Sequence, residues 1–264
     1  FFFRNAPVKR LIGIGMVFLV LQQLMTMGAL AGLEFSRAGL ASPDAEAARQ
    51  AREAVEGFKL GFGVPSDAVI ADLVATYRGS WLEIARHRFE TAAWSPISGL
   101  AMFGFETLAY MLFGMAGFRS GMLTGMWERR RYVRWVAIGF GIGIPVYAAL
   151  AAMMIASDFS MSSTILGVLV LTVPIRPLMI LGWASLIILL MRPGGTLTTR
   201  IAAAGRMAFT NYLATSLICT TLFYGYGLGW YGELSRAEVY LVVFAVWALM
   251  LIWSKPWLER FAYG

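Results

Sequence analysis

The chain has 264 residues, of which 59% are hydrophobic and only 14% are charged. With a mean hydropathy of +0.68, this composition excludes an ordinary soluble domain and is typical of a protein that crosses a membrane several times. The formal net charge of +7 does not indicate nucleic-acid binding, because the basic residues are dispersed and no zinc or RNA-binding signature accompanies them. We therefore expect membrane lipids, with their anionic headgroups, as partners of these residues.

Cysteine and histidine are almost absent. Cys219 and His87 are single residues of their kind, which excludes a disulfide within the chain, a CxxC motif and a histidine-rich metal site. We expect no metal, and the sequence names no cofactor. The chain opens on Phe1 rather than on methionine, without a signal-peptide pattern, and we expect it to be the middle and end of a longer protein.

Apolar runs long enough to cross a bilayer recur about six times. They cover Leu11–Leu33, Ser95–Phe118, Val133–Ala156, Met161–Met191, Arg200–Tyr224 and Ala237–Trp253. The sequence thus predicts an all-α, polytopic transmembrane helix bundle. Its expected parts are a first span at 1–33, periplasmic amphipathic helices at 34–94 and a five-span bundle at 95–264.

Basic residues flank every second junction between these runs. They are Arg4, Lys9, Arg10, Arg119, Arg129, Arg130, Arg131, Arg134, Arg192, Arg200, Lys255 and Arg260. Lys and Arg mark the cytoplasmic ends of membrane spans. We therefore expect a bacterial inner-membrane protein with both ends of this chain in the cytoplasm.

The region 34–94 carries three helix-start signals. Ser42 precedes Pro43 and two acidic residues, Ser66 precedes an apolar repeat, and Ser80 with Glu83 three residues later has the spacing of a capping box. We expect short amphipathic helices that lie on the periplasmic surface or cap the bundle.

Chemistry is expected among the polar groups inside the apolar runs. Glu106, Arg176 and Asn211 each lie near the middle of a predicted span, where an ionisable side chain costs at least about 2.5 kcal/mol and marks a functional site by default. We expect the three to converge on one buried polar site near the bilayer midplane. The alternative is a structural ion pair between Glu106 and Arg176 that holds two helices together.

Three further features concern helix geometry. Pro174 and Pro177 predict that the fourth span is either kinked or broken into two half-helices that meet at Arg176. Gly139 and Gly143, like Gly28 and Gly32, have the spacing that lets membrane helices approach closely. Arg206, near the cytoplasmic end of the fifth span, either snorkels to the interface or binds an anion.

Several segments resemble the bacterial YeiB-like family. They are Tyr77-Arg78-Gly79-Ser80-Trp81, Met111 to Gly121, Ala204-Gly205-Arg206-Met207-Ala208-Phe209-Thr210-Asn211-Tyr212, Phe223 to Gly232 and Trp257 to Gly264. The resemblance spans nearly the whole chain and implies an inner-membrane protein of undefined function. That family in turn resembles transmembrane acyltransferases, which use a buried histidine. Members often carry a histidine shortly after an Ile-Gly pair, where this chain has Ile14-Gly15-Met16.

Three functional readings remain open: an acyl or lipid transferase, a carrier for a small or amphipathic solute, and a non-catalytic accessory subunit of a larger membrane complex or homo-oligomer. We favour an intramembrane ligand site, whose acyl, lipid or small-molecule substrate is transferred or transported. Its expected residues are Glu106, Arg176, Arg206, Asn211 and Tyr212.

Overall fold

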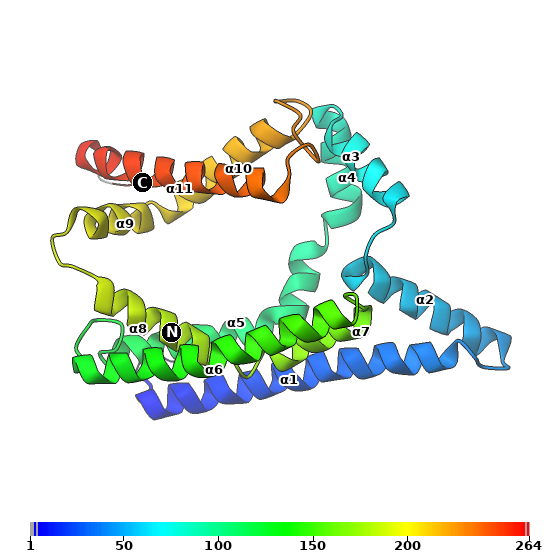
Figure 1. The fold of residues 1–264 in the computed structure, drawn as a ribbon, viewed down its shortest axis with the longest axis horizontal. Helices are drawn as coiled ribbons and strands as arrows, with labels where there is room; N and C mark the ends of the chain where they lie inside the picture. The colour runs from blue at the N-terminus through cyan, green and yellow to red at the C-terminus, as the bar shows by residue number, and fades with distance from the viewer. Residues whose placement is uncertain (1–2, 4, 262, 264) are drawn as a thin grey trace. The chain divides into compact units, whose positions relative to one another are not determined.

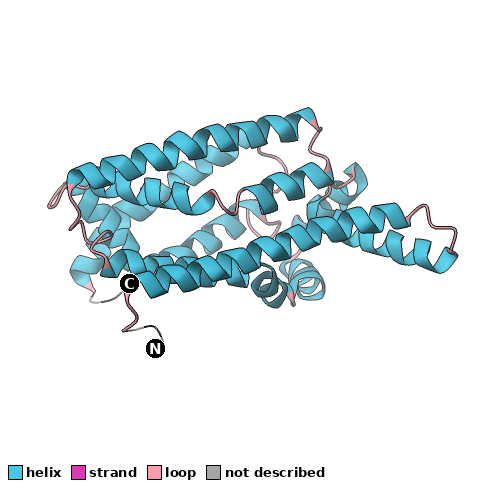
Figure 2. Cartoon of the chain, turned by 90° about the horizontal axis from the view of Figure 1, so that it is seen from below, coloured by secondary structure: helices cyan, strands magenta, loops and turns pink. Residues whose placement is uncertain are grey.

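A computed structural model describes residues 3, 5–261 and 263, so Arg4, predicted to flank the first span, lies outside the described residues. The described residues form helices joined by turns and loops, as predicted (Figures 1 and 2). Contacts group the chain into two units: Phe1–Pro65 with Pro96–Leu190, and Ser66–Ser95 with Met191–Gly264.

Among the described residues, four helices are long and apolar enough to cross a membrane. They are α1 (Val8–Gly39), α5 (Ser95–Arg119), α6 (Arg129–Ala156) and α11 (Arg236–Arg260). The segments Met161–Leu171 and Arg176–Leu190 together form a fifth, broken candidate, and α10 (Ala208–Phe223) is a shorter apolar helix. The predicted polytopic helical fold is thereby confirmed, and about six spans fit these helices.

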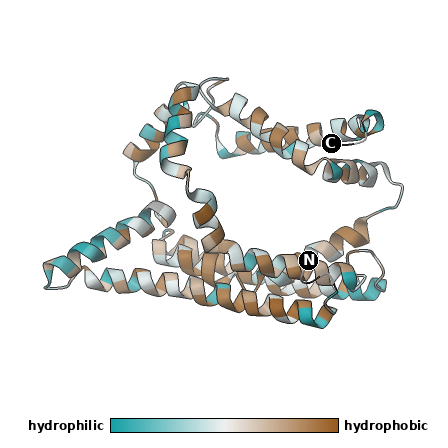
Figure 3. Ribbon diagram, turned by 180° about the vertical axis from the view of Figure 1, so that it is seen from behind, coloured by the Kyte–Doolittle hydropathy of each residue, from teal (hydrophilic) through white to brown (hydrophobic). Residues whose placement is uncertain are grey.

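Helix α1 continues beyond the predicted first span. Its 32 residues extend about 48 Å at 1.5 Å per residue, which exceeds the roughly 30 Å of hydrocarbon in a bilayer. Helix α2 (Ala45–Phe62) folds back on this extension and buries Ala48 and Ala51. The surface of α2 is largely hydrophilic, whereas hydrophobic residues dominate much of the long helices (Figure 3).

The predicted disruption of the fourth span is a break. The first half consists of α7 (Met161–Thr164) and the π-helix η1 (Ile165–Leu171), and the second half is α8 (Arg176–Leu190). The two halves meet at a bend of 58°. Pro174 lies in the interruption, where it removes an amide donor, and Pro177 lies in the first turn of α8, where proline is tolerated.

Helices α6 and α8 lie side by side at a glycine contact (Figure 1). A Cβ atom on Gly139 would lie 2.6 Å from the carbonyl oxygen of Leu178 and 2.8 Å from the Cα of Gly182. The predicted close approach at Gly139 is thus confirmed. At Gly28 and Gly32 it is not found, because a Cβ atom there would meet nothing within 4 Å.

The predicted continuous span Arg200–Tyr224 is wrong in its extent. The structure has two helices here, α9 (Thr196–Arg206) and α10, separated at Met207. The physical reason is the side chain of Asn211, whose Nδ2 donates to the carbonyl oxygen of Ala204 at 3.0 Å. This bond satisfies a carbonyl in the last turn of α9, where helical partners are lacking.

In the second unit, α3 (Asp67–Tyr77) and α4 (Trp81–Ala92) begin after Ser66 and Ser80, as predicted, and Ser80 forms the predicted capping box with Glu83. The turn between them contacts the loop that follows α10. The amide of Gly225 donates to the carbonyl oxygen of Tyr77 at 2.9 Å, and Arg78 pairs with Glu233 at 2.5 Å. The two predicted periplasmic junctions therefore lie together.

Candidate functional site

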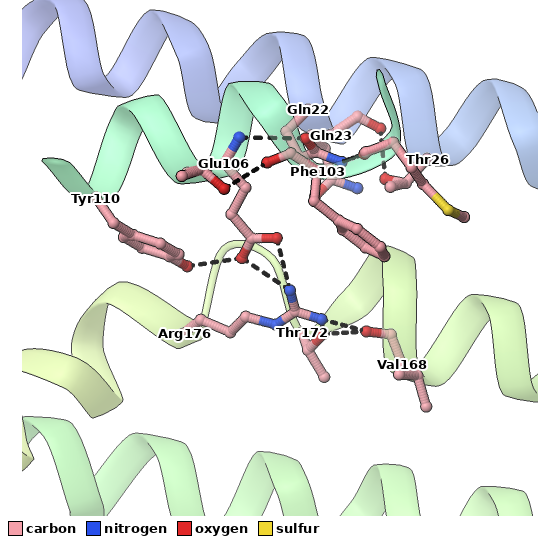
Figure 4. Close-up of polar contacts among 11 residues, drawn as sticks. Gln22, Gln23, Thr26, Phe103, Glu106, Tyr110, Val168, Thr172 and Arg176 are labelled. Atoms are coloured by element: carbon pink, nitrogen blue, oxygen red, sulfur yellow. Dashed lines mark hydrogen bonds and ion pairs between the residues drawn. The ribbon is translucent and has the colours of Figure 1, made fainter. Parts of the chain in front are cut away.

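The first unit contains a partly buried ion pair between Glu106 on α5 and Arg176 at the start of α8 (Figure 4). Nη1 of Arg176 donates to both carboxylate oxygens of Glu106, each at 2.7 Å. The Glu106 side chain is 8% exposed and that of Arg176 is 26% exposed. The structure therefore brings together two of the predicted site residues.

The same guanidinium crosses the break in the fourth span. Nη2 of Arg176 donates to the carbonyl oxygen of Val168 at 2.6 Å and to Oγ1 of Thr172 at 2.8 Å. Helix ends leave carbonyl groups without helical donors, and here the charged side chain supplies one. Arg176 thus joins the two halves of the span as well as α5. Its Nε has no hydrogen-bond partner among the described residues.

Glu106 has two further neighbours. The hydroxyl of Tyr110, one turn along α5, donates to Oε1 of Glu106 at 2.8 Å. The amide of Glu106 donates to Oε1 of Gln22 at 3.2 Å, and Nε2 of Gln22 donates to the carbonyl oxygen of Met102 at 2.9 Å. The Gln22 side chain therefore bonds the amide of Glu106 and the carbonyl oxygen of Met102, which lie one turn apart on α5. These two bonds hold α1 beside the Glu106 carboxylate.

A polar atom next to this network has no partner. Oε1 of Gln23 is buried without a hydrogen bond to any described residue. Buried polar atoms almost always have a partner in protein, water or ligand. Gln23 follows Gln22 on α1, so an unpaired acceptor lies on the helix that contacts Glu106.

Asn211 and Tyr212 belong to the second unit. Asn211 is 5% exposed. Besides Ala204 it bonds Oγ of Ser254 at 3.2 Å, and its Oδ1 accepts from Nε1 of Trp253 at 2.9 Å. Its amide is thus fully engaged in joining α9, α10 and α11. The convergence of Asn211 with the ion pair stays a prediction.

A cavity of about 530 Å³ adjoins Asn211 within the second unit. It is lined by Ala204, Ala208, Asn211, Tyr212, Thr215, Ser216, Cys219 and Met250. Small side chains and hydroxyl groups dominate this wall, so it offers space and weak hydrogen bonding rather than charge. Tyr212 therefore lies beside a cavity, and its role in ligand binding stays a prediction.

Arg206 ends α9 and is exposed, and its side chain forms no hydrogen bond or ion pair with any described residue. This position suits both sequence-based alternatives, a snorkelling side chain and an anion-binding one. Within the described ranges, no group of His, Cys, Asp and Glu side chains is arranged to hold a metal ion.

Sequence reasoning missed the residues that complete the network, Tyr110 and Thr172. Helical spacing is the signal that could have found both. Tyr110 follows Glu106 by four residues, and Thr172 precedes Arg176 by four, and residues at this spacing face one another on a helix.

Comparison with known proteins identifies a matching family and two uncharacterised relatives. Residues 117–264 match the family described as "Protein of unknown function (DUF418)". The "Uncharacterized protein YeiB" of Escherichia coli (strain K12) is 31% identical over 266 residues, which cover 99% of this chain and 62% of that protein. The "Uncharacterized protein YxaH" of Bacillus subtilis (strain 168) is 46% identical over 69 residues, covering 26% of this chain and 17% of that protein. The chain thus spans less than two thirds of these relatives, and no solved structure matches it.

Proposed function

This chain belongs to the DUF418 family of proteins of unknown function, and from that premise we propose that it binds the anionic end of a substrate inside the membrane. The substrate is an acyl, lipid or small-solute molecule with a carboxylate or phosphate group, which the protein transfers or transports. We also propose that the protein resides in the bacterial inner membrane, with both ends of this chain in the cytoplasm.

The observation that carries the proposal is the position of Arg176 at the break of a membrane-spanning helix. Broken helices provide unpaired backbone groups at the depth where transporters bind their ligands. Arg176 adds a planar fork of donors suited to carboxylate or phosphate. Its side chain keeps 26% of its surface exposed, against 8% for Glu106, so the guanidinium is the accessible member of the pair.

In the structure, the carboxylate of Glu106 is bound to the guanidinium group of Arg176. A substrate anion that takes its place leaves a buried charge unpaired, which is the costly state. The displaced carboxylate of Glu106 would keep its hydrogen bond from the Tyr110 hydroxyl, at 2.8 Å, but no cationic partner, so only a substrate whose other binding contacts offset that cost can displace it. The site is therefore expected to alternate between Glu106 and a substrate group as the anion on Arg176.

Binding of oleate to the purified full-length protein in detergent tests this exchange. Arg176→Lys keeps the charge but loses the fork, so we expect oleate to bind about tenfold more weakly. Glu106→Gln removes the competing anion, so we expect oleate to bind more tightly. Oleyl alcohol has the same chain without the carboxylate, and its binding should change in neither variant.

The matched control is Arg37→Lys, which alters a second Glu–Arg pair, between Glu34 and Arg37 on α1, whose side chains are 51% and 36% exposed. It should leave oleate binding unchanged. If Arg176→Lys and Glu106→Gln both lower stability while oleate binding stays the same, the pair only holds helices together. That result favours the alternative function, a non-catalytic accessory subunit of a larger membrane complex.

A further inference from the structure

A second charged feature lies in the first unit, at the junction between α5 and α6. Arg130, Arg131 and Arg134 line a cavity of about 560 Å³ together with Glu128 and Trp135. The guanidinium groups of these three arginines form no hydrogen bond or ion pair with a described residue. Three guanidinium groups thus share one cavity without a bound carboxylate.

The junction that presents these arginines is ordered by its own hydrogen bonds. Nε1 of Trp127 donates to the carbonyl oxygen of Ser120 at 2.8 Å, and the hydroxyl of Tyr132 donates to that of Met122 at 2.6 Å. The guanidinium of Arg131 lies 3.5 Å from the centre of the Trp127 ring, a cation–π contact. Arg131 is exposed, and its contact with the Trp127 ring favours one orientation of its guanidinium group.

The charges repel one another in this arrangement. Arg130 and Arg134 are four residues apart on α6, the spacing at which like charges destabilise a helix. Glu128 lines the same cavity but pairs with none of them. A multivalent anion in the cavity would accept hydrogen bonds from several guanidinium groups at once and remove the repulsion.

The position of the cavity indicates which class of anion could reach the three arginines. It lies where α5 ends and α6 begins, and both are candidate membrane spans. Two tryptophans, Trp127 and Trp135, stand beside it, and tryptophan is enriched at the level of the lipid headgroups. Phosphate is the anionic group that phospholipids present at this level of a membrane.

We propose that Arg130, Arg131 and Arg134, with Trp135, form a binding site for the phosphate of an anionic phospholipid headgroup. This site is independent of the proposed exchange at Arg176. Free inorganic phosphate has the same chemistry and is distinguished by the test.

The test measures binding of dioleoylphosphatidylglycerol to the full-length protein in nanodiscs that otherwise contain dioleoylphosphatidylcholine. Arg130→Gln and Arg134→Gln should each weaken the apparent affinity about fivefold, the value of one basic residue near an anionic surface. Arg129→Gln is the matched control, because it removes the same charge from a neighbouring residue that does not line the cavity. It should change the affinity less than twofold.

A conservative variant covers the case in which charge removal harms folding. Arg131→Lys keeps the charge and should lower the affinity by about threefold, because lysine has neither the fork nor the planar stack on Trp127. Equal losses in Arg129→Gln and Arg130→Gln would show general surface charge and overturn the site. Unchanged affinity in all variants would overturn it as well. Displacement of the lipid by millimolar inorganic phosphate would overturn the lipid as its natural ligand.

Discussion

Tyr77 stacks on Tyr231, with ring centres 4.8 Å apart and ring planes 19° from parallel. Tyr77 ends α3, and Tyr231 lies in the loop between α10 and α11. Arg78 strengthens the contact by donating from Nε to the carbonyl oxygen of Tyr231 at 2.8 Å. Burial and the nearby tyrosines Tyr77 and Tyr224 raise the pKa of Tyr231, so its ring stays neutral in the stack. The turn between α3 and α4 and the loop between α10 and α11 are therefore expected on the same side of the membrane.

This relationship predicts the outcome of cysteine labelling in intact cells, after Cys219→Ser has removed the native thiol. Asp72→Cys on α3 and Leu228→Cys in the loop after α10 should both react with an impermeant maleimide. Thr196→Cys, at the start of α9, should react only after the cells are opened, because basic residues flank that junction. Different labelling of positions 72 and 228 would contradict the stack, and the reverse of the whole pattern would contradict the orientation.

The ion pair between Glu106 and Arg176 predicts a non-additive effect on stability. Arg176→Met alone should lower the free energy of unfolding by about 3 to 5 kcal/mol, because it leaves a buried carboxylate unpaired. Combining it with Glu106→Leu should cost less than either single change. Unfolding in mixed dodecylmaltoside and SDS micelles measures these differences. Equal or larger loss in the double variant would show that the two side chains do not act as a pair.

Arg206 predicts a different response to a conservative change. Its exposed position at the end of α9 lets a lysine reach the same interface, so Arg206→Lys should leave the melting temperature of the purified protein unchanged. A loss of ligand affinity without a loss of stability would identify an anion site at Arg206, since lysine cannot supply the bidentate fork.

The capping box of α4 predicts a local dependence on pH. Hydrogen bonds from the backbone amide and then the hydroxyl of Ser80 lower the pKa of Glu83 below 4.5. Because the pKa of Glu83 is lower in the folded than in the unfolded protein, its ionised carboxylate stabilises the first turn of α4 at any pH above the unfolded-state pKa. This stabilisation is lost as the pH falls through the folded-state pKa. Amide exchange of α4, corrected for its intrinsic pH dependence, should accelerate in acid. Glu83→Gln should remove that dependence, and an unchanged profile would contradict it.

Local signals predicted the features that depend on a few neighbouring residues. Ser80 and Glu83 mark a helix start because capping is a short-range interaction. Ser66 precedes α3 without a side-chain capping bond. The pairing of Glu106 with Arg176 was predictable because two opposite charges at one membrane depth are least costly when they meet.

Features that depend on distant partners were not predictable in the same way. The break at Met207 follows from Asn211, whose amide bonds Ala204, Ser254 and Trp253 at once. No pattern in the neighbouring sequence predicts that the Asn211 side chain will bond a backbone carbonyl group of the preceding helix. The π-helix from Ile165 to Leu171 likewise has no sequence mark within its own residues.

The break in the fourth span divides the packing of the first unit between two half-helices. Helix α8 packs on α6 through the contact of Gly182 with Gly139, whereas η1 packs on α1 in a cluster that contains Leu33, Ile165 and Leu169. Residues 172–175 lie between these two contacts, and Arg176 bonds across them to the carbonyl oxygen of Val168 at 2.6 Å. One guanidinium group therefore links the packing on α1 to the packing on α6, and its loss is expected to loosen both.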